Sequence, residues 1–90
     1  MNKSELVAKV AETTQMTKKD AGKVVDAVIA SIKQALIEGD NVQLLGFGTF
    51  ETRHRAPRVG RNPKTGEVVH IEARTVPVFR PGKYLKEAVQ

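Results

Sequence analysis

The feature that most constrains the fold is a cluster of turn-forming residues midway along a basic stretch from Arg53 to Arg74. The cluster reads Gly60-Arg61-Asn62-Pro63-Lys64-Thr65-Gly66. Pro63 has the fixed φ that suits the second position of a tight turn, and Gly66 follows two residues beyond the central pair, so the chain is expected to reverse there. The stretch therefore predicts a long β-hairpin that carries charge along both of its strands.

The positive charge of the chain is concentrated in this hairpin and in the residues after it. Residues 1–50 carry six lysines against six acidic residues, and residues 51–90 carry nine basic against four acidic residues, so the net charge of +5 arises entirely in the second half. Like charges on one hairpin repel each other, which predicts a polyanionic partner such as nucleic acid or an anionic membrane. The basic residues of the hairpin are Arg53, Arg55, Arg58, Arg61, Lys64 and Arg74.

The chain is short for an independent core. Ninety residues, 40% of them apolar, predict a single globular domain. If the hairpin projects as an arm, about 68 residues remain, a size at which domains often depend on metals, disulfides or partners. The sequence has no cysteine, and His54 and His70 are not spaced like a pair of metal ligands. We therefore expect oligomerisation to complete the core, and we expect no metal and no cofactor.

Hydrophobic periodicity predicts two helices before the hairpin. Asn2 is a capping residue for a helix over residues 3–14, and Thr17 caps a second helix over residues 18–38 that ends at Gly39. Apolar residues recur in the second helix every three or four positions, so one of its faces needs a cover.

The second half of the chain predicts strands and one short helix. A short strand is expected over residues 41–44, an ascending strand from Phe50, and a returning strand over Val68–Phe79. Pro77 suits an edge or bulge in that strand, because proline cannot donate a ladder hydrogen bond. A C-terminal helix is expected over Lys83–Val89. The apolar residues expected in a core at the dimer interface are Phe47, Phe50, Phe79, Leu44, Ile29, Ile32 and Leu36.

The residues of the chain do not favour catalysis. There is no cysteine nucleophile, and a surface position on a strand is a more common role for His54 and His70 than that of a general base. The Gly46-Phe47-Gly48 turn lacks the third glycine of a dinucleotide-binding fingerprint. Residues 60–66 lack the Gly-Lys-Ser/Thr ending of a phosphate-binding loop. We therefore expect a binding protein and not an enzyme.

The composition and length of the hairpin favour duplex DNA as the partner. Arginine outnumbers lysine there, and its flat guanidinium suits phosphate contacts and narrow grooves of negative potential. The ten steps from Arg53 to Pro63 span roughly 33 Å at the rise of a strand, close to one turn of duplex DNA. An arm of this length can follow a groove, with Pro63 as a rigid apolar residue at its tip.

Short motifs along the whole chain match one known family. They are Gly46-Phe47-Gly48-Thr49-Phe50, Arg55, Arg58, Gly60-Arg61-Asn62-Pro63, Thr65-Gly66, Val76-Pro77, Phe79 and Pro81-Gly82-Lys83. In these motifs the chain resembles the HU and integration-host-factor family of bacterial histone-like DNA-binding proteins. One residue departs from the family: Pro57 stands where a charged or small residue is common, and we expect it to bend or stiffen the arm near its base.

The resemblance implies an α+β fold and an intertwined dimer. Each chain would supply two N-terminal helices to a helical base, a three-stranded antiparallel sheet to a saddle, an extended β-ribbon arm and a short C-terminal helix. We expect one domain over residues 1–90, with the base and the start of the sheet in residues 1–52, the arm in residues 53–74, and the closing strand and last helix in residues 75–90.

The resemblance also implies a function. An architectural protein of this kind binds duplex DNA in the minor groove with little sequence specificity, bends it and compacts the bacterial nucleoid in the cytoplasm, and Pro63 would intercalate between base pairs. Its partners would be DNA and a second copy of itself, or a paralogous subunit in a heterodimer, with no membrane and no small-molecule substrate. The implied DNA-binding residues are Lys3, Arg53, Arg55, Arg58, Arg61, Asn62, Pro63, Lys64, Arg74, Lys83 and Lys86.

Three alternatives remain open at the level of sequence. A site-specific DNA bender of the integration-host-factor type would use the same residue types in its arms. A small basic RNA-binding protein is less favoured, because three phenylalanines and one tyrosine leave few rings to stack on unpaired bases. An anionic-membrane binder would need a basic amphipathic helix, whereas the positive charge lies mostly on predicted strands.

Overall fold

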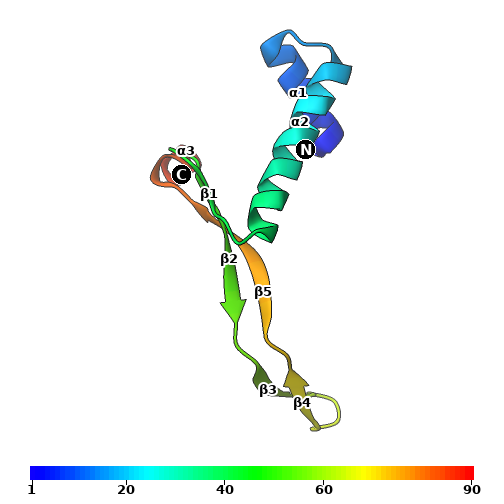
Figure 1. Cartoon of the computed structure of the whole chain (residues 1–90), viewed down its shortest axis with the longest axis vertical. Helices are drawn as coiled ribbons and strands as arrows, with labels where there is room; N and C mark the ends of the chain where they lie inside the picture. The colour runs from blue at the N-terminus through cyan, green and yellow to red at the C-terminus, as the bar shows by residue number, and fades with distance from the viewer. The chain divides into compact units, whose positions relative to one another are not determined.

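The structure, a computed structural model, describes all residues from 1 to 90. Contacts between residues divide the chain into two units, Met1–Ala35 and Leu36–Gln90. No helix combines the length and the apolar character that a membrane span requires. The α+β class is confirmed (Figure 1), and the elements in chain order are α1 (Lys3–Thr14), α2 (Lys18–Ile37), β1 (Val42–Leu44), β2 (Gly48–Arg55), β3 (Arg58–Arg61), β4 (Val68–Ile71), β5 (Arg74–Pro81) and α3 (Lys83–Ala88).

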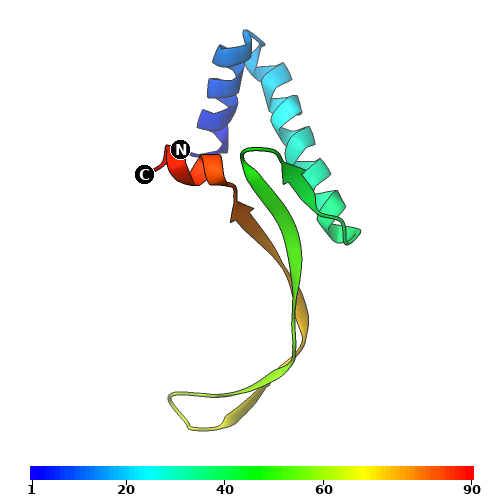
Figure 2. The same cartoon turned by 90° about the vertical axis from the view of Figure 1, so that its left-hand side faces the viewer.

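The first unit consists of α1 and most of α2, which form a V (Figure 2). Both predicted helix caps are present. The side-chain Oδ1 of Asn2 accepts a hydrogen bond of 2.8 Å from the N–H of Glu5, and the Oγ1 of Thr17 accepts one of 3.1 Å from the N–H of Asp20. These bonds satisfy N–H groups that have no partner within the first turn of a helix, which is why the sequence signals place the two helix starts correctly.

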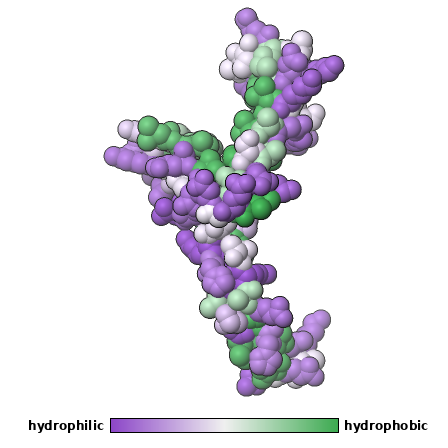
Figure 3. Space-filling model, viewed as in Figure 1, coloured by the Kyte–Doolittle hydropathy of each residue, from purple (hydrophilic) through white to green (hydrophobic).

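The helix pair buries few of its own apolar side chains. Ala11, Ala21 and Val25 are the only buried hydrophobic residues of the whole chain. Val28 and Ile29 are 52% and 51% exposed. An open recess on this unit is lined only by aliphatic side chains, those of Leu6, Val10, Val24, Val25, Val28 and Ile29. The apolar surface predicted for these helices therefore exists, and it is uncovered in the single chain (Figure 3).

The second unit is built on a three-stranded antiparallel sheet, as predicted, and its strand order is β1-β2-β5. Val42, Phe50 and Phe79 lie side by side across its three strands. Pro77 of β5 pairs with Thr52 of β2. Because β5 is an edge strand, the missing N–H of Pro77 interrupts no ladder to a further strand. The sequence therefore located this edge correctly.

A tight glycine turn joins β1 to β2. Gly46 has a φ of 82°, which favours glycine, and the N–H of Phe47 donates to the carbonyl of Leu44 at 2.9 Å. A Cβ on Gly48 would lie 2.6 Å from both the carbonyl oxygen of Arg80 and the Cζ of Phe79. The first residue of β2 must therefore be small for β5 to pair beside it.

Beyond the sheet, β2 and β5 continue into a two-stranded arm that is completed by β3 and β4 (Figures 1 and 2). The sequence predicted a continuous returning strand over residues 68–79. Instead both strands are interrupted at the same level, at residues 56–57 and 72–73. The register is unchanged across the interruption, because Arg55 pairs with Arg74 before it and Arg58 pairs with Ile71 after it. Pro57, which has no N–H to donate to a ladder, lies at this interruption.

Candidate nucleic-acid interface

Asn62 organises the turn at the tip of the arm through three hydrogen bonds. Its N–H donates to the carbonyl of Glu67 at 2.8 Å, and its own carbonyl accepts from the N–H of Gly66 at 2.8 Å. Its side-chain Oδ1 accepts from the N–H of Lys64 at 2.9 Å. Gly66 has a φ of 73° and so supplies the left-handed residue that closes the loop. Pro63 lies inside this turn and is exposed.

Two further side chains brace the tip. The guanidinium Nη1 of Arg61 lies 3.5 Å from the carbonyl oxygen of Gly66, to which it donates, and the Oγ1 of Thr65 accepts from the N–H of Glu67 at 3.3 Å. Side-chain bonds of this local kind fix a turn without any contact to the rest of the chain. The tip is therefore a defined loop even though it has no core beneath it.

Alternation along the strands places four arginines on one face of the ladder between β2 and β5. Arg53 and Arg55 of β2 project to the same side as Arg74 and Arg80 of β5, since successive side chains of a strand point to opposite faces. The other face carries the Phe50–Phe79 pair. The sheet therefore has one cationic face and one apolar face at the root of the arm.

Glu51 lies among these arginines and contacts two of them. Its Oε1 is 3.0 Å from the Nε of Arg80 and 3.9 Å from the Nη2 of Arg53. The side chain of Glu51 is only 19% exposed, whereas those of Arg80 and Arg53 are 64% and 57% exposed. The side chain of Glu51 is therefore largely covered, whereas those of the two arginines are mostly accessible to solvent.

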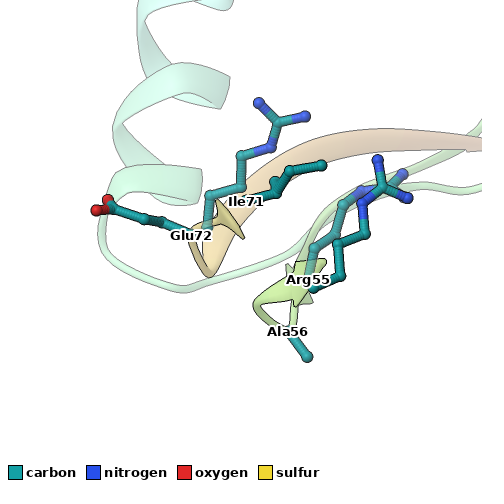
Figure 4. A pocket seen from close by; sticks show the side chains of 6 residues that line it. Arg55, Ala56, Ile71 and Glu72 are labelled. Carbon is teal, nitrogen blue, oxygen red and sulfur yellow. The ribbon is translucent and has the colours of Figure 1, made fainter. Parts of the chain in front are cut away.

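Basic side chains occupy both faces of the outer part of the arm. Arg58 pairs with Ile71 and Arg61 pairs with Val68, three positions apart along β3, so these two arginines project to opposite sides. A recess at the strand break is lined by Arg55, Ala56, Arg58, Ile71, Glu72 and Arg74. In Figure 4 the carboxylate of Glu72 points away from the guanidinium of Arg55.

The structure brings some of the predicted binding residues together and leaves others separate. Arg55, Arg58 and Arg74 line one recess, whereas Lys3 of α1 forms an ion pair with Asp26 of α2. Both partners of that pair are more than half exposed, so it stabilises the fold by only about 0–1 kcal/mol. Every predicted cation is exposed: Lys3, Arg53, Arg55, Arg58, Arg61, Lys64, Arg74, Lys83 and Lys86. Asn62 is half-buried in the turn that it organises.

Sequence reasoning missed Arg80 as a member of the cationic face. The returning strand was predicted to end at Phe79, whereas β5 continues to Pro81, which pairs with Gly48. Every second residue of a strand lies on the same face, so a strand extended to Pro81 would have placed Arg80 on the face of Arg74. The role of Glu51 had no sequence signal, because its contact with Arg80 depends on the register between two strands.

The three phenylalanines expected in the core lie together as an aromatic cluster. The ring centroids of Phe50 and Phe79 are 4.7 Å apart, and those of Phe47 and Phe79 are 5.5 Å apart. Phe47, Phe79 and Leu44 nevertheless remain 47%, 37% and 40% exposed. On α2, Ile29 is exposed and Ile32 and Leu36 are half-buried. None of the seven residues predicted for a dimer core is fully buried within one chain.

Known proteins resemble this chain over its full length. The family model described as bacterial DNA-binding protein matches residues 1–90. DNA-binding protein HU of Geobacillus stearothermophilus is 61% identical over 90 residues, which are 100% of both chains. DNA-binding protein HU of Streptococcus thermophilus is 58% identical over 89 residues, which are 99% of this chain and 98% of the relative.

Solved structures agree with these relatives. An Anabaena HU–DNA cocrystal structure is similar with a TM-score of 0.92 and 50% identity, covering 99% of this chain and 97% of that one. HU from Thermotoga maritima is similar with a TM-score of 0.71 and 34% identity, covering 100% of both chains. Matches of sequence and fold over the whole length show that this chain belongs to the family of bacterial DNA-binding proteins.

Proposed function

We propose that two copies of this chain form an architectural dimer that binds double-stranded DNA with little sequence specificity and bends it. The observation that carries the proposal is the arm. It is a two-stranded ribbon with arginines on both faces and no core of its own, ending in a braced turn that exposes Pro63. Such a ribbon has the dimensions and the charge to follow a groove of duplex DNA. Relatives in this family are named DNA-binding proteins.

The exposed apolar surfaces support the dimer. The recess on the helix pair and the aromatic face of the sheet are both uncovered in one chain, and exposed apolar surface of this kind marks an interaction site. A second copy supplies the same surfaces in return, as a two-fold interface requires. We assign Phe47, Phe50, Phe79, Leu44, Ile29, Ile32 and Leu36 to the shared core of a homodimer.

The arm residues have distinct roles in the proposed complex. The arginines neutralise phosphates along the minor groove, while Pro63, with no N–H and a rigid apolar ring, inserts between base pairs at the tip. The lysines outside the arm contact phosphates that flank the bent segment. The residues assigned to DNA are Lys3, Arg53, Arg55, Arg58, Arg61, Asn62, Pro63, Lys64, Arg74, Lys83 and Lys86.

The proposed organisation and location follow from the same features. We treat residues 1–90 as one DNA-binding domain, with residues 53–74 as the arm between the base of residues 1–52 and the closing strand and helix of residues 75–90. Phosphate contacts carry no sequence information, so binding of this kind suits a protein that coats much of a chromosome. The protein would then associate with the nucleoid in the cytoplasm.

A salt titration tests the proposal directly. A complex that uses 6 to 10 phosphate contacts should lose roughly 10³- to 10⁵-fold in affinity between about 50 and 200 mM salt. Fluorescence anisotropy of short labelled duplexes of random sequence measures this slope, and a flat response would exclude the proposal. Competition between random duplexes and candidate sites separates a general DNA bender from a site-specific one. Competition with single- and double-stranded RNA tests whether the protein prefers DNA to RNA.

A further inference from the structure

We infer that Glu51 lowers the affinity of the root of the arm for DNA, because it competes with DNA phosphates for Arg53 and Arg80. Arg80 is thereby added to the DNA-contacting surface, and Glu51 is a positioning residue that acts through both arginines. The inference rests on the proposed binding of DNA and goes beyond it, because it concerns an acidic residue that sets the strength of that binding.

The first observation is the geometry of the three side chains. One carboxylate oxygen, the Oε1 of Glu51, lies 3.0 Å from the Nε of Arg80 and 3.9 Å from the Nη2 of Arg53. Guanidinium has five N–H donors in a fixed fork, and the carboxylate contacts Arg80 at Nε. Guanidinium also binds phosphates through these same N–H donors, so the carboxylate and a phosphate compete for the charge of Arg80.

The second observation is where the cluster lies. Glu51 pairs with Val78, Arg53 with Val76 and Arg80 with Thr49, so all three charged residues share the face of the sheet opposite the Phe50–Phe79 pair. The same face continues to Arg55 and Arg74 at the start of the arm. DNA that lies along this face would therefore meet Arg53 and Arg80 as well as those two arginines.

The third observation is the balance of charge and exposure. Glu51 is the only acidic residue of the β2–β5 ladder, where four arginines share its face. Its side chain is 19% exposed, whereas those of Arg80 and Arg53 are 64% and 57% exposed, so the arginines are the more accessible to DNA. Two arginines with one carboxylate present a net charge of +1, whereas the same arginines alone would present +2. A phosphate that binds here must weaken both ion pairs, which lowers the net gain from contact.

The variant Glu51→Gln tests this inference in the full-length chain. It removes the negative charge and keeps an oxygen that can accept from Arg80. The salt slope should steepen by about 1, since one more cation becomes available to phosphates. Relative to the wild type, affinity should rise at low salt, and the gain should shrink about threefold between roughly 50 and 200 mM salt. Anisotropy titrations of a short random duplex at four salt concentrations give both numbers.

Glu72→Gln is the matched control. It makes the same change of charge on the same arm, and Glu72 points away from Arg55 at the strand break (Figure 4). Its gain should be clearly smaller than that of Glu51→Gln. Equal gains for the two variants would overturn the inference, because the effect would then be one of total charge.

A variant that lacks both arginines distinguishes two ways in which Glu51 could weaken binding. Glu51 could act through Arg53 and Arg80, or its carboxylate could simply repel DNA. In Arg53→Ala/Arg80→Ala, the further change Glu51→Gln should alter neither affinity nor slope, because the carboxylate has no cation left to hold. A gain that persists undiminished in this background would contradict the inference. Circular dichroism melts of every variant establish that the chain is folded. If the wild-type chain shows no salt-dependent binding to DNA, the proposed function itself is refuted. Failure of the inference about Glu51 and failure of the proposed function are therefore distinguishable.

Discussion

Arg55 and Arg74 form the last pair of the β2–β5 ladder, so two residues of the same charge stand directly opposite each other across the arm. Directly opposed like charges destabilise a pair of strands. The nearest acidic residue beyond this pair, Glu72, directs its carboxylate away from Arg55 (Figure 4). The arm is thus built with a local repulsion that a bound phosphate would relieve.

Replacing Arg74 with glutamine tests this relationship. Arg74→Gln should weaken duplex binding and reduce the salt slope by about 1, as the loss of one phosphate contact predicts. The free protein should be as stable or more stable, by about 0.2–1 kcal/mol, because the opposed charge is gone. Anisotropy titrations and thermal melts at one chain concentration measure the two effects. Thr75→Gln, on the other face of the same strand, is the control and should leave the slope unchanged.

Arg61 should contribute affinity without reading sequence. Arg61→Ala removes a cation beside the tip together with a long contact to the carbonyl of Gly66, so binding should weaken by a similar factor for every duplex tested. Affinities for a panel of random and A·T-rich duplexes at one salt concentration measure this. A loss confined to one sequence would instead identify Arg61 as a reader of bases.

The local features of the fold were predictable from sequence because their causes are local. The helix starts follow from Asn2 and Thr17, whose side chains accept hydrogen bonds from N–H groups three residues on. The turn at the tip follows from Pro63 and Gly66 in the same way. The chain order of these elements therefore needed no knowledge of long-range contacts.

The features that depend on the exact register between distant residues were not predictable. The returning strand was extended through residues 72–73, because nothing nearby breaks it; the interruption is opposite Pro57, on the other strand. The contact between Glu51 and Arg80 likewise requires the register that pairs Glu51 with Val78. Sequence reasoning identified which residues carry charge, and only the register showed which of them face each other.

Pro63 should affect bending more than affinity. In Pro63→Ala the charges of the arm and the hydrogen bonds of Asn62 remain, so duplex binding should survive while the bend decreases because the rigid apolar ring is lost. Ring closure of short DNA fragments, or energy transfer between labelled duplex ends at saturating protein, measures the bend. Lys64→Ala is the complementary control, with weaker binding and an unchanged bend at saturation. Unchanged ring closure by Pro63→Ala would rule out insertion of the proline.

Two glycines should respond to alanine in opposite directions. At Gly48 a new Cβ would lie 2.6 Å from the carbonyl oxygen of Arg80 and from the ring of Phe79, so Gly48→Ala should destabilise the fold by about 1–3 kcal/mol through overpacking. At Gly22, inside α2, the new Cβ would meet only the Cγ1 of Val7 at 3.8 Å, an ordinary contact. Gly22→Ala should therefore stabilise the fold by about 0.5–1 kcal/mol, because alanine loses less backbone entropy in a helix.

Chemical denaturation of both variants at one chain concentration measures these changes, since the stability of a dimer depends on concentration. The signs are the important result. A stable Gly48→Ala variant would mean that β5 can shift away from the start of β2 without cost. In that case the pairing of Gly48 with Pro81 would not be what holds Arg80 within reach of Glu51. If Gly48→Ala is destabilised, the effect of Glu51→Gln on the salt slope can be measured on the fraction that remains folded. Loss of that effect would connect the packing at Gly48 to the charge cluster on the opposite face of the sheet.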